Sequence, residues 1–380
     1  MKYLAVLGRQ PEISITELVL SGSCRTFSSP TSLTFSGGAS PGLSPAHVEF
    51  ESDISIDINR FGGILKLAVK LEEKPLEYLQ RLPEGKITLG VSDYSKKASR
   101  KTATVEALKL KKILTRHGRS VRVVENKDAA LSTATSLHNG LSGKNERKVE
   151  LIKVDNGWYR VIGVQDIDAY AKRDQARPAR DAKVGMLPPK LAQILINLCG
   201  PLKPGSTILD PFCGTGVVLQ EAVLMGYQAY GTDISERMVE YSKKNLNWLL
   251  KSENNLFQIS QGDATSFCWG QPIDAVACEG YLGRPFSQIP TEMALKEQKQ
   301  ECGAIILGFL KNLAGQIEVG TPVVIAVPAW LRGSGEYERL DILDEIETMG
   351  YNVNNKSREG LLYHRPEQIV ARDIIILRKK

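Results

Sequence analysis

Acidic residues and a glycine-rich turn follow apolar segments in the C-terminal half of the chain. The segment 207–210 ends at Asp210 and leads into the turn Pro-Phe-Cys-Gly-Thr-Gly, which ends at Gly216. Asp233 comes 17 residues after Gly216, and Asp263 follows a third apolar segment. Glycine lets a ligand approach the backbone, and carboxylates at strand ends can hydrogen-bond to ribose or amino groups. The pattern therefore predicts a nucleotide-type ligand.

The details of the turn favour S-adenosylmethionine over other nucleotides. A Gly-Lys-Ser/Thr sequence is absent, which excludes a P-loop, and the third glycine of a dinucleotide fingerprint would fall on Leu219. Asp210 would repel a pyrophosphate but attract an ammonium and a sulfonium group. The alternative for the turn alone is an ordinary strand–turn–helix corner that binds nothing. The predicted cofactor-binding residues are Asp210, Phe212, Cys213, Gly214, Gly216, Asp233, Ile234, Asp263, Ala264 and Glu279.

The elements that position these residues alternate between strand and helix from residue 205 onward. The expected strands cover 207–210, 228–233, 256–262, 275–279 and 322–328, and the expected helices cover 217–225, 236–250, 292–313 and 338–349. Alternating units form a parallel sheet with helices on its faces. Two final strands, 360–364 and 369–377, have no helix between them and should form a hairpin that makes one strand antiparallel. This is the Rossmann-like α/β sheet of class I methyltransferases. Asp233 is assigned to the ribose hydroxyls, and Asp263 either to the adenine amino group or to a simple turn.

The remainder of the chain suggests smaller domains. Residues 1–80 resemble an α+β, ferredoxin-like unit, with an expected strand at 47–58 and a serine-, glycine- and proline-rich, flexible insertion at 21–46. Residues 81–170 form a second unit, 171–189 a basic linker and 190–380 the α/β domain.

Composition indicates a cytoplasmic protein. The content of 42% hydrophobic and 24% charged residues is ordinary for a globular chain. Six cysteines form no CxxC pair, and the histidines show no ligand spacing, so we expect no metal. Apolar segments are too short for a signal peptide or a membrane span. We expect a monomer without membrane association.

Positive charge is concentrated in the middle of the chain, although the net charge is only +6. Such a bias suggests a surface for phosphates, and the alternative is a solvated helix face. The predicted RNA-binding residues are Lys97, Arg100, Lys111, Lys112, Arg116, Arg173, Arg177 and Arg180.

Several motifs make the chain resemble the THUMP-domain tRNA guanosine-N2 methyltransferases, which modify position 10 of tRNA. They are LGRQPEISITEL at 7–18, RDQARPARDAKVGMLPPKLAQILINL at 173–198, DPFCGTG at 210–216, GTDIS at 231–235 and LLYHRPEQIVARDIIIL at 361–377. The resemblance covers most of the chain and is weakest over 21–75. It implies that 81–170 is a THUMP-like RNA-binding domain, that tRNA is the partner and that S-adenosylmethionine donates the methyl group.

The chain departs from this family at the fourth strand of the α/β sheet. The family motif Asp-Pro-Pro-Tyr-Gly aligns with Glu279-Gly280-Tyr281-Leu282-Gly283. In the family, a carboxylate and a backbone carbonyl accept hydrogen bonds from the guanine amine, and the aromatic ring stacks the base. The resemblance therefore assigns catalysis to Glu279, Gly280 and Tyr281, with Tyr281 a candidate to replace the lost aromatic. Other readings are amino-methylation of rRNA or DNA, or an RNA-binding protein that keeps the cofactor pocket but has weak turnover.

Overall fold

The computed structural model describes residues 1–24, 26–27, 46–181, 186–251, 256–356, 360–366 and 368–380. The chain divides into two compact units, Met1–Ala169 and Tyr170–Lys380. Most of the insertion expected at 21–46, and residues 182–185 of the expected linker, lie outside the described residues.

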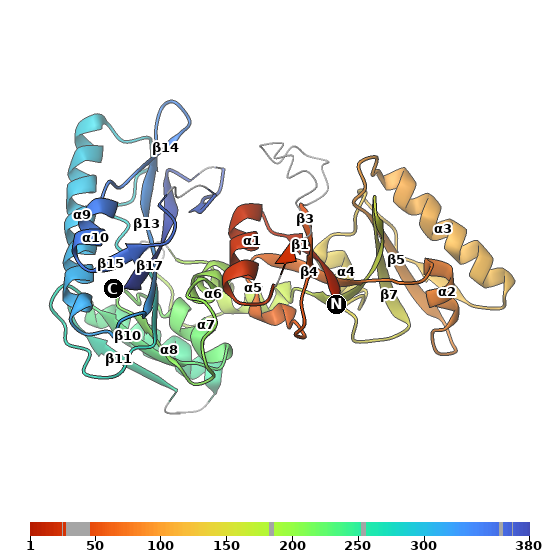
Figure 1. The fold of residues 1–380 in the computed structure, drawn as a ribbon, viewed down its shortest axis with the longest axis horizontal. Coiled ribbons are helices and arrows are strands. Elements are labelled where there is room, and N and C mark those ends of the chain that lie inside the picture. Colours follow the sequence, from red (N-terminus) through yellow and green to blue (C-terminus); the bar gives the residue numbers. More distant parts are fainter. Residues whose placement is uncertain (25, 28–45, 182–185, 252–255, 357–359, 367) are drawn as a thin grey trace. The chain divides into compact units, whose positions relative to one another are not determined.

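The first unit is built on one eight-stranded sheet with the order β2-β3-β1-β4-β8-β7-β5-β6 (Figure 1). Its strands are β1 (Lys2–Leu7), β2 (Thr26–Phe27), β3 (His47–Glu51), β4 (Ile64–Lys70), β5 (Ile87–Asp93), β6 (Val121–Val123), β7 (Lys148–Val154) and β8 (Gly157–Val164). Its helices are α1 (Pro11–Leu20), α2 (Pro75–Gln80), α3 (Arg100–Arg116) and α4 (Thr133–His138), with a 3-10 turn at Ile58–Arg60. β5 runs parallel to β6 and β7, and β4 pairs antiparallel with β8. The sheet therefore continues unbroken across the domain boundary expected near residue 80.

A buried ion pair lies inside this sheet. Lys66 Nζ on β4 donates to Glu150 Oε1 on β7 at 2.5 Å and to the Leu131 carbonyl at 2.7 Å. Ser92 and Ser136 each donate a hydroxyl hydrogen bond of 2.6 Å to the same carboxylate. Burial lowers the pKa of Lys66, and the negative charge of Glu150 opposes that shift. Each charge thus has a partner. Because Lys66, Ser92 and Ser136 all donate to Glu150, the network joins β4, β5 and α4 to β7.

The second unit contains the predicted α/β sheet, in the order β11-β10-β9-β12-β13-β17-β15. Its strands are β9 (Thr207–Asp210), β10 (Gln228–Asp233), β11 (Phe257–Gln261), β12 (Ala275–Glu279), β13 (Pro322–Leu331), β14 (Tyr337–Arg339), β15 (Tyr351–Val353), β16 (Leu362–Tyr363) and β17 (Val370–Lys379). β9 to β13 are parallel, and β17 runs antiparallel between β13 and β15. β16 pairs with β17, which confirms the terminal hairpin.

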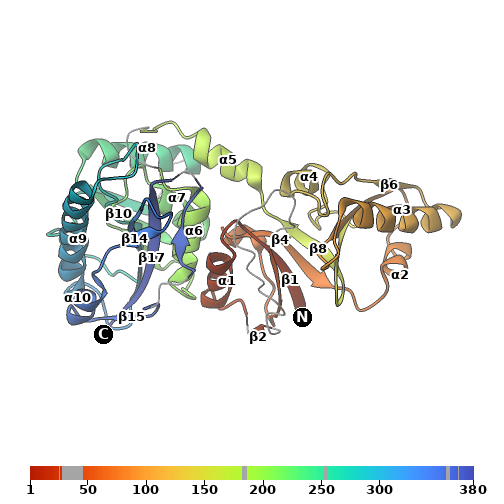
Figure 2. The ribbon, with the colours of Figure 1, turned by 90° about the horizontal axis from the view of Figure 1, so that it is seen from above.

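Helices cover both faces of this second sheet. They are α6 (Pro189–Leu198), α7 (Val217–Leu224), α8 (Glu236–Leu250), α9 (Glu292–Ala314) and α10 (Leu343–Thr348), and α5 (Ile167–Gln175) crosses the division between the units. Figures 1 and 2 show α9 and α10 on one face and α6, α7 and α8 on the other. The strand order reverses between β9 and β12, and ligands of open α/β sheets bind outside the carboxyl ends of strands at such a switch point.

Two sequence expectations were wrong in extent. The strand expected at 47–58 ends at Glu51, where the next residue, Ser52, accepts the Ile54 amide with its hydroxyl at 3.2 Å. Further on, the Asp57 side chain accepts the Asn59 amide and begins the 3-10 turn. The helix expected at 338–349 covers only Leu343–Thr348. Leu340 and Ile342 are buried while Asp341 between them is exposed, so this segment packs in an extended form, which the charge pattern did not reveal. Part of the expected linker is also helical, in α5.

Lys66→Met should destabilise the protein by about 3–5 kcal/mol, because the Glu150 carboxylate would remain buried without its counter-ion. Replacing both residues, with Glu150→Gln added, should cost less than Lys66→Met alone. Denaturant unfolding of the full chain measures both. The control is Lys2→Met, which removes the exposed Lys2–Glu51 pair (3.7 Å) and should change stability by less than about 1 kcal/mol. An equal effect of Lys66→Met and Lys2→Met would contradict the role of the network.

Candidate active site

The backbone conformation of the turn after β9 requires glycine at two positions. Gly214 and Gly216 have φ angles of 50° and 81°, in the left-handed region that other residues rarely adopt. Gly216 is the N-cap of α7, and a Cβ there would lie 2.8 Å from Ser242 Oγ on α8. The turn therefore presents bare backbone at the carboxyl end of β9, as predicted from the sequence.

Asp233 ties the end of β10 to this turn. Its Oδ2 accepts the Gly214 amide at 2.9 Å, and its Oδ1 accepts the Ser235 amide at 2.9 Å. Burial raises the pKa of Asp233, and the two amides oppose the shift. A carboxylate has about four acceptor positions, so both oxygens keep capacity for the ribose hydroxyls expected here.

Three carboxylates gather at the carboxyl edge of the sheet. Asp210 is 2% exposed, and its Oδ1 accepts the Phe212 amide at 3.1 Å. Burial raises the pKa of Asp210 well above its usual value; the Phe212 amide opposes this, and the negative charges of Asp233 and Glu279 add to it. A bound cation would therefore favour the ionised forms of these carboxyl groups.

The remaining predicted cofactor residues flank this edge. Phe212 packs edge-on against Phe309 at 5.2 Å, and the buried Cys213 donates its amide to the Thr232 carbonyl at 2.9 Å. Ile234 is 68% exposed directly after Asp233, which leaves an apolar side chain for a purine ring. The bare turn, the carboxylates and this apolar side chain fit S-adenosylmethionine, which carries two positive charges and an adenine.

Asp263 and Ala264 lie in the turn after β11. Asp263 Oδ1 accepts the amide and hydroxyl of Thr265, at 2.9 and 2.7 Å, and these bonds lower the pKa of Asp263. Ala264 is buried, and its carbonyl accepts from Asn312 Nδ2 at 3.0 Å. Asp263 thus shapes a turn, and its contact with adenine stays a prediction.

Glu279 lies at the end of β12, and sequence reasoning missed its partner. Arg372 on β17 donates Nε to Glu279 Oε1 at 2.8 Å, and the Arg372 residue is only 6% exposed. Burial raises the pKa of Glu279, and the positive charge of Arg372 opposes the shift. Arg372 lies within the tail motif at 361–377, but nothing in the spacing along the chain links it to Glu279.

The loop after Glu279 is held against α9. Gly280 donates its amide to the Ala326 carbonyl at 2.9 Å, a hydrogen bond that a proline cannot make. Tyr281 donates its hydroxyl to Glu301 Oε1 at 3.0 Å, and its ring packs against the core. Gln298 donates to Glu301 at 2.9 Å and accepts the Arg284 amide at 2.7 Å. In this conformation Tyr281 is engaged by α9, and its role in stacking a base stays a prediction.

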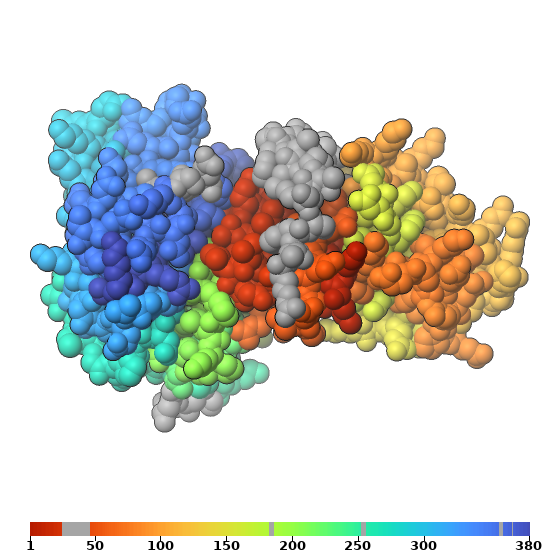
Figure 3. Space-filling view, in the orientation of Figure 1, coloured from red at the N-terminus to blue at the C-terminus, as the bar shows by residue number. Residues whose placement is uncertain are grey.

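The basic residues expected to bind RNA differ in their exposure. On and before α3, Lys97, Arg100, Lys112 and Arg116 are exposed and Lys111 is partly exposed, and the side chains of α3 reach the surface of the first unit (Figure 3). Arg100 pairs with Glu125 at 2.9 Å. Arg180 is exposed and donates to the Gln175 carbonyl.

Two of the linker arginines are turned inward, which corrects the expectation for them. Arg173 Nε donates to the buried Glu221 Oε1 at 2.6 Å, and the Arg177 residue is 3% exposed. Burial lowers the pKa of Arg177, while the nearby Asp174 opposes the shift. These two cations neutralise acidic residues of their own domain, so in this structure they do not present charge to a polyanion.

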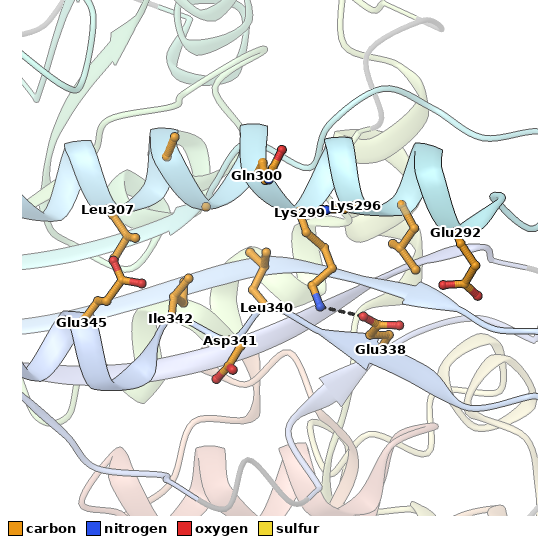
Figure 4. Close-up of a pocket in the computed structure, with 13 residues that line it drawn as sticks. Glu292, Lys296, Lys299, Gln300, Leu307, Glu338, Leu340, Asp341, Ile342 and Glu345 are labelled. Atoms are coloured by element: carbon orange, nitrogen blue, oxygen red, sulfur yellow. Dashed lines mark hydrogen bonds and ion pairs between the residues drawn. The ribbon is translucent and has the colours of Figure 1, made fainter.

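A groove of about 430 Å³ lies elsewhere in the second unit, between α9 and the segment around β14 (Figure 4). Lys299 and Glu338 pair across it at 2.6 Å. None of the predicted cofactor or catalytic residues lines it. The strand ends at the switch point, not this groove, therefore form the candidate site.

Within the described part of the chain, no helix has the length and apolar character to cross a bilayer. The same residues contain no group of three or more His, Cys, Asp or Glu side chains arranged to hold a metal ion.

Comparison with known proteins shows which family and which relatives this region is similar to. Residues 177–298 match the family described as UPF0020, RMKL-like, methyltransferase domain. The tRNA (guanine(10)-N2)-dimethyltransferase of Methanothermobacter thermautotrophicus is 32% identical over 160 residues, which cover 42% of this chain and 44% of that protein. The protein of the same name from Pyrococcus abyssi is 30% identical over 195 residues, which cover 50% of this chain and 49% of that protein. The alignments thus span about half the length of these relatives. The crystal structure of TrmN from Thermus thermophilus aligns over 100% of both chains with 17% identity and a TM-score of 0.47.

Asp233→Ala should weaken binding of S-adenosylmethionine by roughly 10- to 100-fold, as expected for loss of hydrogen bonds to a charged group. Titration calorimetry measures the affinity. The matched control is Asp274→Ala, because Asp274 also accepts a backbone amide (Thr207, 2.7 Å) but at the amino end of the sheet. If Asp233→Ala binds as tightly as Asp274→Ala, Asp233 has no role in holding the ribose.

Proposed function

We propose that this chain, whose residues 177–298 match an RMKL-like methyltransferase domain, methylates the exocyclic N2 amine of a guanosine in tRNA, at position 10. The observation that carries the proposal is the meeting of the glycine turn, Asp233 and Glu279 at one switch point. It is supported by relatives that are named tRNA (guanine(10)-N2)-dimethyltransferase, each of which aligns with this chain over about half of the relative's length. The proposed partner is tRNA, and the proposed compartment is the cytoplasm.

In this proposal the cofactor is S-adenosylmethionine, which when bound supplies a methyl group activated by a positive sulfonium. The Gly214–Gly216 backbone, Asp210, Asp233 and Ile234 would hold it. Asp210 is buried and Asp233 is partly buried, and both have raised pKa values, so a cationic ligand would offset the charge of their ionised forms. Cofactor binding should therefore favour their ionised forms.

Glu279 and Gly280 act on the acceptor. The lone pair of the guanine N2 amine is delocalised into the ring, which makes it a poor nucleophile. A hydrogen bond from the amine to the Glu279 carboxylate, and a second to the Gly280 carbonyl, would favour a pyramidal nitrogen. As the N–C bond forms, the bond between the methyl carbon and the sulfonium sulfur would break and leave its electron pair on sulfur. The nitrogen then loses a proton, and Glu279 is the carboxylate at hand to accept it. The remaining contribution is orientation of the in-line attack.

The first unit would bind the RNA. The exposed cations of α3 supply a phosphate-binding surface, and neutralising phosphates releases counter-ions, so affinity should fall steeply with salt. An affinity for tRNA that stays constant from low to moderate salt would contradict this role.

Glu279→Ala should reduce methyl transfer to background and leave the affinity for S-adenosylmethionine within about threefold, since truncation removes the amine's acceptor. The assay incubates the full chain with labelled methyl donor and, in parallel reactions, undermodified tRNA, rRNA or DNA, and nucleoside mass spectrometry identifies the product. N2-methylguanosine in tRNA supports the proposal. Label in rRNA or DNA instead, or cofactor binding with no transfer by the unaltered chain, rejects it. Retained turnover in Glu279→Ala would mean that another group orients the amine.

Reversing two charges on α3, with Lys111→Glu and Lys112→Glu, should weaken tRNA binding about tenfold or more. The slope of log affinity against log salt should become shallower by about one to two, since phosphate contacts are lost. Cofactor affinity should not change. The matched control reverses Lys243 and Lys244, two consecutive exposed lysines on α8. Equal losses in both double variants would show that α3 is not a specific contact.

A further inference from the structure

We infer that Arg372 is a positioning residue for the acceptor amine: its guanidinium occupies one oxygen of Glu279 and so presents the other to the substrate. The inference rests on the proposed function, because it assigns Glu279 to the amine. It adds a residue from the final strand to a site otherwise built from the ends of the parallel strands.

The antiparallel direction of β17 places Arg372 at the site. Glu279 is aligned with Ala326 on β13, and Ala326 with Ile374 on β17. Arg372 comes two residues before Ile374, opposite Pro328, so it lies on the same face of the sheet and nearer the carboxyl edge. Its side chain crosses β13 to reach Glu279. A parallel strand in this place would bring its end, rather than its beginning, to this edge.

The contact with Arg372 engages only one of the two oxygens of the Glu279 carboxylate. Arg372 Nε donates to Oε1 at 2.8 Å, and among the residues that the structure describes no hydrogen bond to Oε2 is found. The Glu279 side chain is 15% exposed, which leaves a route for a ligand. A carboxylate held on one side by a guanidinium keeps a fixed orientation. Oε2 is therefore the oxygen available to the amine.

Arg372 also opposes the surrounding negative charge. The titratable and charged groups that interact with Glu279 in the described structure are Arg372 from β17, Asp210 from β9 and Cys278 beside it on β12. Burial raises the pKa of Glu279 and Arg372 counters it. Without Arg372, the pKa of the Glu279 carboxyl would be higher, so the group would stay protonated up to a higher pH. The protonated oxygen could no longer accept a hydrogen bond from the amine.

The next residue of β17 provides a matched control. Asp373 is fully buried, and Arg339 Nη1 lies 3.8 Å from its Oδ1. This Arg–Asp pair involves the same strand but not Glu279. Arg339→Gln should therefore disturb β17 without changing the charge of the acceptor carboxylate.

The test compares Arg372→Gln, Arg372→Lys and Arg339→Gln in the full chain. Arg372→Gln should lower kcat for methyl transfer about 100-fold, with cofactor affinity within about threefold. The acidic limb of its pH–rate profile should move to higher pH, because activity requires ionised Glu279. Arg372→Lys restores the charge without the fork of the guanidinium, so the limb should move back and kcat should recover in part. Arg339→Gln should keep the unaltered profile. A loss of kcat in Arg372→Gln without movement of the limb would reduce Arg372 to a structural role and overturn the inference.

A second readout works without RNA. Carbon-13 NMR of glutamate-labelled protein follows the Glu279 carboxyl, assigned by its absence in Glu279→Gln. Its titration midpoint should be higher in Arg372→Gln than in the unaltered chain, and unchanged in Arg339→Gln. If the unaltered chain methylates no RNA, the proposed function fails, whereas an unchanged NMR midpoint in Arg372→Gln rejects the role of Arg372 independently.

Discussion

Negative charge gathered at the carboxyl ends of neighbouring parallel strands is the constraint around which the second unit is organised. Asp210, Asp233 and Glu279 come from three adjacent strands, and each is held where burial disfavours ionisation. Backbone amides donate hydrogen bonds to the first two, and an arginine donates one to the third. An arrangement of this kind is costly for the protein alone and favourable once a cation is bound. It explains why the glycine turn must leave the backbone open beside these groups.

The loop after Glu279 lacks the prolines of the family motif that it resembles, and the structure shows which contacts hold this loop instead. A proline would restrict the backbone through its ring. Here Gly280 uses its amide for a hydrogen bond to Ala326, and Tyr281 and Arg284 are fastened to α9 through Glu301 and Gln298. The loop is thus held by tertiary hydrogen bonds instead of by residue type. The longer arm of Glu279 is likewise restrained by Arg372.

The first unit combines a long sheet of parallel and antiparallel strands with exposed cations on its surface. The Lys66–Glu150 network binds central strands from within. The positive charge of α3 stays outside, because the buried face of this helix consists of alanines and leucines at helical spacing. Two lysines of this unit therefore have different roles: the buried Lys66 stabilises the core, whereas Lys112 faces solvent.

The sequence by itself determined the alternation of strands and helices in the second unit as far as β13, the glycine turn, the acidic residues at the ends of β9 and β10, and the terminal hairpin. These depend on local periodicity, turn chemistry and connection rules, which act over a few residues. The sequence did not predict β14, which overlaps an expected helix, or β15, where no element was expected. Only the tertiary structure decided which charges meet. Arg372 reaches Glu279 across an intervening strand, from 93 residues away in sequence. Arg177 is buried, and the partly buried Arg173 pairs with Glu221, although the composition of this segment suggested an exposed linker. The extended segment at Leu340 and Ile342 was decided in the same way, by packing against α9. The sequence does not show which group a charged side chain contacts, because strand register and burial decide its partner.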